Sequence, residues 1–368
     1  MAGIYIHVPF CKSKCCYCDF YSMPSRGRDD LMEKYFQGVL NEFKHRSSLL
    51  SGLNVNTLYI GGGTPSSLLL PLLANLIDAL LVPEMKEVTV EINPEDITPA
   101  LVELLASKGV NRVSMGIQSF NSDLLKFVGR RHSSDDIFNA VKLLRSAGIS
   151  NISGDLIFGL PGDTFDGWKR SVETFMKLGL PHLSAYLLSY EPGTRLTVMR
   201  DLGKIVEATE DLVTRMYLHL IETSARHGYE HYEISNYAIP GYKSKHNSSY
   251  WDGTIYLGLG PGAHSFDGTT RSFNPPSLKE YIANNGLVNV IEETSLTDKI
   301  NDLIITTLRT SSGLNLNTLS AYQRDQILLR GKSHLNRGTL NISVDNRLYI
   351  PEEHFLISDS ILVDLIFD

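Results

Sequence analysis

HVPFCKSKCCYCDF, residues 7–20, contains all four cysteines of this 368-residue chain. Three of them, Cys11, Cys15 and Cys18, keep the spacing C-x3-C-x2-C. A disulfide scaffold would spread its cysteines along the chain, so a clustered set points to a metal. No cysteine or close Cys/His pair elsewhere completes a tetrahedral zinc site, and three thiolates suit a [4Fe-4S] cluster with one open iron. The alternative is a chance cluster of reduced structural thiols.

Composition places the chain among globular proteins, with 42% hydrophobic and 20% charged residues. A net charge of −7 gives no global basic surface that would attract nucleic acid. No signal peptide is visible, and the most apolar run, 68–82, is too short for a membrane span and is broken by Pro71, Asn75 and Asp78. Together with the reduced thiols, these features predict a cytoplasmic protein.

Short β-like runs alternate with amphipathic stretches along the first half of the chain. The strands are expected at 3–7, 57–61, 88–92, 112–117, 152–158 and 182–188. The helices between them are expected at 30–49, 67–81, 99–107, 133–147 and 165–177. This alternation predicts the α/β class. The strand spacing suits right-handed crossovers in a partial (β/α)6 barrel of the TIM type over residues 1–240.

The last third of the chain has a different pattern. After a helix expected at 208–227, residues 241–296 form an aromatic, Gly-rich connecting region. From 297 to 368 the pattern indicates helices near 298–309 and 316–329, followed by β-hairpin-like runs near 340–344 and 347–350. We therefore expect a smaller mixed α+β C-terminal module that resembles a winged helix.

Glycines and polar residues recur where the expected strands end. Gly61-Gly62-Gly63-Thr64-Pro65 follows the second strand, where missing side chains let the backbone approach a ligand and offer its amides. Glu91 ends the third strand, Gln118 ends the fourth, and Asp155 lies on the fifth. Taken alone, a glycine triplet also suits an ordinary turn, and Glu91 also suits the exposed face of an edge strand. Because barrel sites form at the carboxyl ends of the strands, the coincidence predicts one site there.

Five motifs resemble those of the radical SAM superfamily, in its HemN/HemW branch of oxygen-independent coproporphyrinogen dehydrogenases and haem chaperones. They are C-x3-C-x-Tyr-C, Gly-Gly-Gly-Thr-Pro, Glu-x-Asn-Pro, Gly-x-Gln-Ser and Asp-Leu-Ile-x-Gly-Leu-Pro. The resemblance covers nearly the whole chain from Tyr5. It implies that three cysteines hold a [4Fe-4S] cluster and that S-adenosylmethionine chelates the fourth iron. Reduction would then split the sulfonium to a 5′-deoxyadenosyl radical.

The resemblance also implies roles for individual residues of this sequence. The implied cluster ligands are Cys11, Cys15 and Cys18. The implied S-adenosylmethionine contacts are Tyr5, Tyr17, Gly62, Gly63, Thr64, Glu91, Gln118, Arg130 and Asp155. Two alternatives stay open: the adjacent Arg131 could serve in place of Arg130, and Cys16 could ligate if the loop slipped by one residue. Cys16 stands where relatives often carry proline, and we expect a spectator thiol there.

The sequence His-Asn-Ser-Ser-Tyr-Trp at 246–251 matches the His-Asn-x-x-Tyr-Trp motif of the haem-chaperone branch, which implies that His246 binds haem. From the residues alone, a histidine packed beside Tyr250 and Trp251 explains the pattern better. His264 is a second candidate ligand, and His7 is expected to be structural. No C-x-x-C-H motif indicates cytochrome-c-type attachment.

Two functions follow from the resemblance. The first is a haem chaperone that binds haem, the cluster and S-adenosylmethionine and passes haem to acceptor proteins. The alternative is an oxygen-independent coproporphyrinogen III dehydrogenase that decarboxylates propionates oxidatively. The dehydrogenases resemble C-x3-C-x-Phe-C-x-Cys, and Phe20 stands here in place of the last cysteine of that pattern. The chain also begins two residues before the first strand and contains His246. These three features favour the chaperone. A radical SAM enzyme acting on RNA is disfavoured by the acidic balance.

The chaperone reading predicts transient partners. A membrane respiratory oxidase is a natural acceptor, which implies proximity to a membrane surface, and no nucleic-acid partner is expected. We also hypothesise a homodimer in which cluster loading controls dimerisation and haem release.

Overall fold

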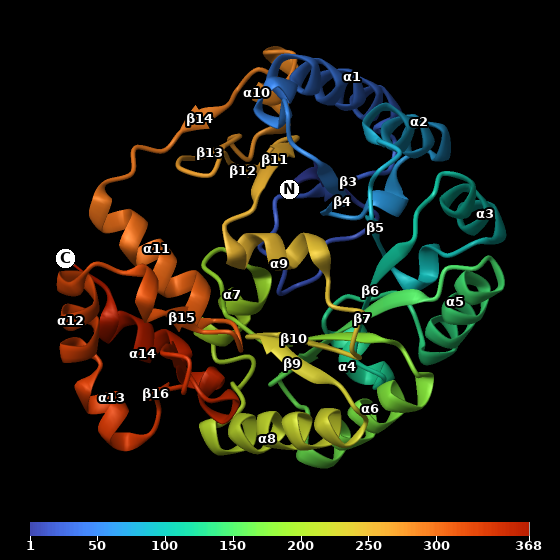
Figure 1. Ribbon diagram of the computed structural model, residues 1–368. Helices are drawn as coiled ribbons and strands as arrows, with labels where there is room; N and C mark the ends of the chain where they lie inside the picture. The colour runs from blue at the N-terminus through green and yellow to red at the C-terminus, as the bar shows by residue number, and fades with distance from the viewer. Residues whose placement is uncertain (368) are drawn as a thin grey trace.

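The computed structural model describes residues 1–367, and its centre is a twelve-stranded sheet curved into an incomplete barrel with helices around it (Figure 1). Six strands of this sheet are parallel neighbours, as the sequence predicted. They are β1 (Ala2–Val8), β4 (Val55–Gly62), β5 (Glu87–Ile92), β6 (Arg112–Gln118), β7 (Asn151–Phe158) and β8 (His182–Leu187). The predicted α/β class with a parallel barrel is confirmed.

Both edges of the parallel sheet are extended by strands that the sequence did not reveal. The strand β11 (Ile255–Leu259) pairs parallel with β1, so residues distant in sequence complete the barrel wall beside the first strand. The other added strands are antiparallel to their neighbours. They are β12 (His264–Phe266), β13 (Arg271–Phe273) and β14 (Val290–Ile291) beyond β11, and β10 (Asn236–Ala238) and β9 (Glu230–Glu233) beyond β8.

The helices connect successive strands and cover the outside of the barrel (Figure 1). The first eight are α1 (Asp29–Arg46), α2 (Leu70–Leu80), α3 (Pro99–Ser107), α4 (Ser122–Phe127), α5 (Ser134–Ser146), α6 (Phe165–Leu178), α7 (Arg195–Asp201) and α8 (Glu210–Arg226). The start of α2 falls three residues later than predicted because Pro65–Ser67 forms a separate 3-10 turn. Pro71 then lies in the first turn of α2, where a missing backbone N–H costs nothing.

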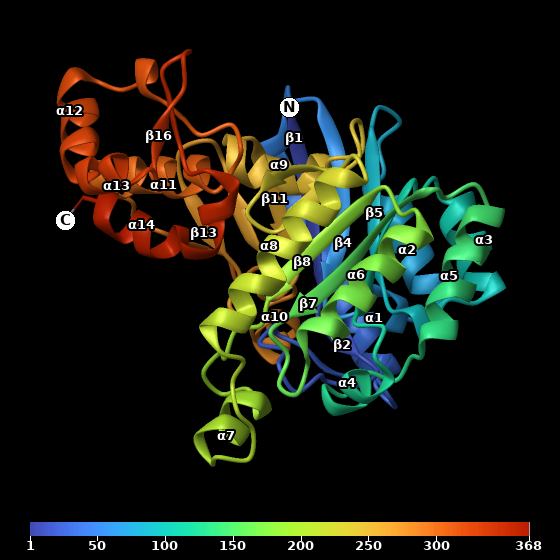
Figure 2. The same ribbon diagram turned by 90° about the horizontal axis from the view of Figure 1, so that it is seen from below.

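The C-terminal part is a mixed module, as predicted, and it lies beside the barrel (Figures 1 and 2). Its helices, with the two that precede it, are α9 (Lys245–Asp252), α10 (Leu278–Ala283), α11 (Leu296–Leu308), α12 (Ala321–Arg330), α13 (Lys332–Arg337) and α14 (Ser358–Leu365). Its antiparallel sheet consists of β15 (Leu314–Asn315), β17 (Arg347–Tyr349) and β16 (Asn341–Ile342). No helix within residues 1–367 is long and apolar enough to cross a membrane.

The inside of the barrel is unusually polar. Side chains alternate along each strand, so the apolar residues that face the helices alternate with residues that face the barrel axis. The inward positions at the start of the strands carry buried polar side chains, namely Thr57, Glu87, Arg112, Ser153 and His182. Parallel barrels are commonly filled there by branched apolar side chains. The apolar core therefore lies between the sheet and the helices, and polar side chains occupy the axis of the barrel.

The two ends of the barrel are closed by different elements (Figure 2). The helix α9 lies at the end where β1 begins. At the opposite end, where the parallel strands finish, lie α4, α7 and the short parallel strands β2 (Phe10–Cys11) and β3 (Met23–Pro24). The cysteine loop is therefore at the carboxyl end of the strands, as the sequence predicted.

Candidate functional site

A cavity of about 370 Å³ opens at the carboxyl ends of the parallel strands. Side chains from the cysteine loop and from the ends of β4 to β8 line it. The sequence-predicted residues in its wall are Cys11, Cys15, Tyr17, Cys18, Gly62, Gly63, Thr64, Glu91, Gln118, Arg130 and Asp155. Tyr5 and His246 are not in this wall. The fold thus brings most of the predicted site residues together around one space.

The three spaced cysteines all line this cavity. Cys11 ends β2, and the backbone N–H of Cys18 donates to the carbonyl of Cys15 at 3.3 Å, which closes a turn. The Thr64 hydroxyl donates to the Cys11 sulfur at 3.3 Å, and the Arg130 guanidinium donates to the Cys15 sulfur at 3.7 Å. Burial raises the pKa of Cys18 to about 11, so a metal must displace a proton from this sulfur when it binds.

These thiols fit an iron–sulfur cluster better than a single ion. Within residues 1–367 no three Cys, His, Asp or Glu side chains converge on one ion position. A cluster does not need such convergence because each thiolate binds a different iron. Hydrogen-bond donors to two of the sulfurs and a cavity beside all three complete the fit.

Cys16 lies outside this set. Its side chain is 7% exposed and packs in an apolar cluster with Leu124, Val128 and Leu196. Its thiol is directed at the Phe127 carbonyl, 3.8 Å away. A one-residue slip of the loop would have to pull this thiol out of its apolar surroundings, so the placement agrees with a spectator thiol.

Replacing Cys16 by alanine is therefore expected to leave cluster iron unchanged. The free energy of unfolding should fall by about 1 kcal/mol because a small buried side chain is shortened. Iron analysis after anaerobic reconstitution and urea unfolding of the cluster-free protein measure the two effects. An iron content reduced by half or more would make Cys16 a ligand.

The glycine triplet at the end of β4 lets two structures approach its backbone closely. A Cβ atom on Gly61 would lie 2.7 Å from the Glu91 carboxyl, and one on Gly63 would lie 2.7 Å from the carbonyls of Val8 and Phe10. Gly62 has a φ of +98°, which side-chain-bearing residues rarely adopt. Its amide donates to Glu91 Oε2 at 3.1 Å. The triplet is thus needed to seat the Glu91 carboxyl and the cysteine loop.

Two half-buried carboxyls lie in the cavity wall. Burial raises the pKa of Glu91 to about 7, against opposing hydrogen bonds from Tyr59 (2.7 Å) and Gly62. Burial also raises the pKa of Asp155 to about 6, although the Ser184 hydroxyl and the Arg112 charge act in the other direction. Such carboxyls bind cationic or hydroxyl groups of a ligand with strong hydrogen bonds once they ionise.

Arg130 is the arginine that lines the cavity. Its guanidinium donates to Asn93 Oδ1 at 2.6 Å and to the carbonyl of Gly116 at 2.5 Å. Arg131 is instead outside the wall, where it pairs with Glu95 at 3.3 Å. The alternative in which Arg131 replaces Arg130 is therefore disfavoured by the geometry.

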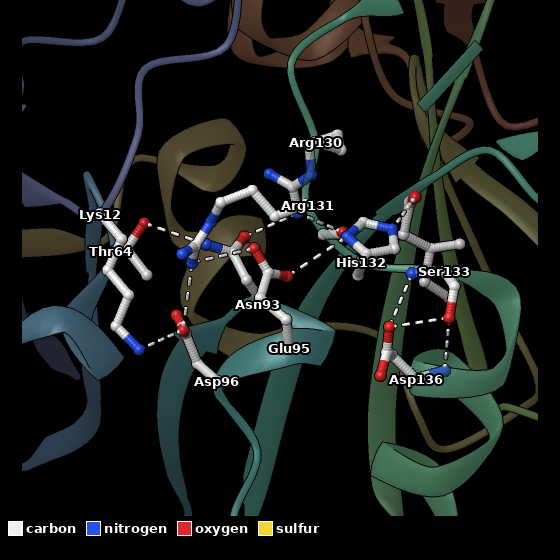
Figure 3. A network of polar contacts seen from close by, with 12 residues as sticks. Lys12, Thr64, Asn93, Glu95, Asp96, Arg130, Arg131, His132, Ser133 and Asp136 are labelled. Carbon is white, nitrogen blue, oxygen red and sulfur yellow. Dashed lines mark hydrogen bonds and ion pairs between the residues drawn. The ribbon is translucent and has the colours of Figure 1, made fainter. Parts of the chain in front are cut away.

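A second group of polar contacts fixes the loops that carry these residues (Figure 3). The Asp96 carboxylate accepts from Lys12 at 2.6 Å and from Ser66 at 2.9 Å, so the cysteine loop is tied to the turns after β4 and β5. His132 Nδ1 lies 3.3 Å from Glu95 Oε2. Burial acts to raise the pKa of Glu95, but the hydrogen bond from His132 and the nearby arginine outweigh it and lower the pKa to about 2.

Gln118 shows backbone strain at the end of β6. Its φ is +65°, and the pairing register with β7 shifts between Gly116 and Gln118. A non-glycine residue in this conformation is uncommon and clusters at functional sites. The irregularity turns the Gln118 side chain into the cavity wall.

Tyr5 and His246 occupy the barrel axis beneath the cavity. His246 is 0% exposed, with its Nδ1 2.8 Å from the Thr57 hydroxyl and its Nε2 2.9 Å from the Tyr250 hydroxyl. Its ring stacks on Tyr59 and Tyr5, at centroid distances of 5.1 and 6.3 Å. In this conformation both ring nitrogens have hydrogen-bond partners, so neither is free to bind an iron.

Burial lowers the pKa of His246 to about 3, and the Arg112 charge acts in the same direction. Gly3 creates the room for the ring, since a Cβ there would lie 2.6 Å from the Thr57 hydroxyl and 3.1 Å from His246 Nδ1.

The other histidines of the predicted set lie elsewhere. His264 is exposed and stacks on Phe273, and His7 is buried with its Nε2 2.9 Å from the Tyr21 carbonyl.

Sequence reasoning missed several residues of these two regions. Asn93 belongs to the Glu-x-Asn-Pro motif, but the sequence predicted no role for it, although its Oδ1 accepts a hydrogen bond from Arg130. Tyr59, Thr57 and Glu87 lie within strands, and a single strand does not reveal which face looks inward. The signal that could have found them is their alternation with apolar residues along β4 and β5.

Comparisons with known proteins give a consistent picture. Residues 5–175 match the model of the Radical SAM superfamily. The chain is 36% identical to the haem chaperone HemW of Lactococcus lactis over 316 residues, which is 84% of this chain and 82% of that protein. It is 32% identical to HemW of Mycobacterium tuberculosis over 374 residues, which is 99% of this chain and 94% of that protein. The structure of coproporphyrinogen III oxidase (HemN) from Escherichia coli superposes with a TM-score of 0.84 at 22% identity, covering 99% of this chain and 90% of that one.

Proposed function

Because the chain belongs to the HemW haem-chaperone family of the radical SAM superfamily, we propose that it binds haem and delivers it to acceptor proteins. The observation that carries the proposal is the identity to HemW proteins, which extends over nearly the whole chain. The likeness to HemN is a likeness of fold at low identity.

The cavity at the barrel mouth is where we place the cofactors that the superfamily implies, a [4Fe-4S] cluster and S-adenosylmethionine. Cys11, Cys15 and Cys18 are the proposed cluster ligands. When bound, the cluster supplies an electron to the sulfonium of S-adenosylmethionine. Thr64 and Arg130 stabilise the ligating sulfurs through the hydrogen bonds described above.

The remaining wall residues suit the polar groups of S-adenosylmethionine. Glu91 and Asp155 are acceptors for its amino group and ribose hydroxyls. The fixed Arg130 guanidinium presents a positive charge to its carboxylate. The strained Gln118 and the backbone of Gly62 and Gly63 complete the wall. These assignments rest on the convergence of the residues around one cavity.

His246 is the proposed haem ligand. The support comes from the match of residues 246–251 to the HemW-branch motif. The geometry of the site adds none, because the ring is enclosed in this conformation. The acceptors we propose are respiratory enzymes, reached through transient contacts. The alternative function, oxygen-independent coproporphyrinogen III dehydrogenase, is tested in the same preparation by decarboxylation of coproporphyrinogen III.

An anaerobic haem titration of the cluster-reconstituted protein tests this proposal. We expect one haem per chain in the unmodified protein. His246→Ala should weaken the affinity at least about tenfold, since loss of an axial ligand removes a metal bond. His264→Ala is the matched control, because this exposed histidine was the other candidate, and it should stay within about twofold of the unmodified protein.

Absorption spectroscopy follows each addition of haem. A protein that binds no haem would overturn the chaperone proposal. Equal haem affinity in His246→Ala and the unmodified protein would leave the chaperone proposal standing and would remove His246 from the site.

A further inference from the structure

The enclosed position of His246 conflicts with a role in binding iron unless α9 moves. Both ring nitrogens have hydrogen-bond partners, and the ring projects into the barrel axis from the second residue of α9. An iron can reach this ring only after the first turn of α9 has left the end of the barrel. The following inference rests on the proposed function and concerns what permits that movement.

Glu87 is the residue that anchors the first turn of α9. This first residue of β5 is 1% exposed and faces the barrel axis. Its carboxylate accepts from the backbone N–H of Lys245 at 2.9 Å and from that of His246 at 2.9 Å. The Ser244 hydroxyl lies 3.5 Å from the same carboxylate. A buried carboxylate on the otherwise unpaired amides at the start of a helix is a strong restraint.

Arg112 lies on the neighbouring strand without a comparable partner. It is 1% exposed, and its Nε and Nη1 have no hydrogen-bond partner within residues 1–367. No carboxylate of that part of the chain forms an ion pair with it. A buried guanidinium in this state is costly, and native proteins usually satisfy it.

Glu87 and Arg112 face the same part of the barrel axis. Thr89 is the register partner of Arg112 between β5 and β6, and Glu87 is two residues earlier on the same face of β5. Burial raises the pKa of Tyr232, and the charges of Glu87 and Arg112 both act on that hydroxyl. The two opposite charges thus face the same part of the barrel axis, yet only the carboxylate bonds to α9.

We propose that Glu87 and Arg112 form a two-state latch for α9. In the closed state the carboxylate holds the amides of Lys245 and His246. In the open state the carboxylate turns to Arg112, the first turn of α9 leaves the barrel, and His246 becomes accessible to haem. The ion pair formed on opening offsets the helix contacts that are lost, so the two states differ little in free energy. Arg112 is then a positioning residue for haem binding.

Hydrogen exchange of the α9 amides tests the latch without haem. Arg112→Met removes the alternative partner of Glu87 and should slow exchange across residues 244–253 about tenfold, because opening becomes rarer. Arg112→Gln, which keeps a polar side chain in the polar barrel, should behave in the same way and serves if the methionine variant does not fold. Arg112→Lys keeps a cation and should stay within about threefold of the unmodified protein.

Exchange in α5, on the far side of the sheet, reports changes in global stability and provides the reference. If hydrogen exchange of the α9 amides, relative to those of α5, is unchanged or faster in both Arg112→Met and Arg112→Gln, the latch is overturned. This is the result expected if buried water satisfies the Arg112 guanidinium instead. Haem association should slow by the same factor as exchange. Because exchange is measured on haem-free protein, a protein that binds no haem would refute the proposed function while leaving the latch result intact.

Discussion

Cys15→Ala is expected to abolish cluster loading, with iron after reconstitution falling from about four atoms per chain to fewer than about one. With only three ligating thiols available, the loss of one leaves an iron of the cluster without its protein ligand. Arg130 also loses the sulfur to which it donates at 3.7 Å. The visible absorption of the reconstituted protein should disappear in parallel with the iron.

The matched control is Cys16→Ala, one residue further along the same loop. Both variants remove one thiol from the same reconstitution mixture, and they differ only in whether the thiol faces the cavity. Near-normal iron in Cys15→Ala would mean that Cys16 replaces the lost ligand. Circular dichroism of the cluster-free proteins should show equal helix content, because neither change reaches the apolar core between sheet and helices.

The cavity could be predicted from the sequence because its parts are local. The strands that contribute to it are short apolar runs, and the residue that lines the cavity lies at or near the end of its strand, as for Glu91 and Gln118. Parallel strands joined by helices bring all carboxyl ends to one edge, so the position along a strand predicts the position in space. The cysteine spacing is likewise a local property of one loop.

The lower half of the barrel could not be predicted in this way. β11 pairs with β1 across some 250 residues of sequence, and nothing local to Ile255–Leu259 reveals that partner. The burial of His246 depends on the same long-range contacts, since Thr57 and Gly3 come from strands near the other end of the chain. The residues around His246 did indicate a packed histidine, but they could not indicate that strands from the start of the chain enclose the ring.

Glu91→Gln is expected to weaken S-adenosylmethionine binding at least about tenfold at pH 7.5, which corresponds to the loss of one charge-assisted hydrogen bond. The pKa of Glu91 is raised to about 7, so the carboxylate is present above this pH and is lost as the pH falls through it. Between pH 6 and 7.5 the affinity of the unmodified protein should rise about eightfold, following the ionised fraction. Asp155, whose pKa is raised to about 6, faces the same cavity, so its ionisation adds to the rise in affinity near pH 6. Isothermal titration of the cluster-loaded protein measures this profile, which should be much flatter in the variant.

The same substitution should stabilise the cofactor-free fold, which separates a lost contact from a damaged structure. Because the pKa of Glu91 is about 7 in the fold and 4.5 ordinarily, its ionisation costs the native state about 3 kcal/mol at pH 8, and that cost is absent below about pH 4.5. Removing the charge should therefore raise the free energy of unfolding at pH 8 while ligand affinity falls. Glu233→Gln is the matched control, since burial raises the pKa of Glu233 to about 7 as well, but it lies outside the cavity wall. It should stabilise the protein and leave binding unchanged, and parallel losses of stability and affinity in Glu91→Gln would contradict the assignment.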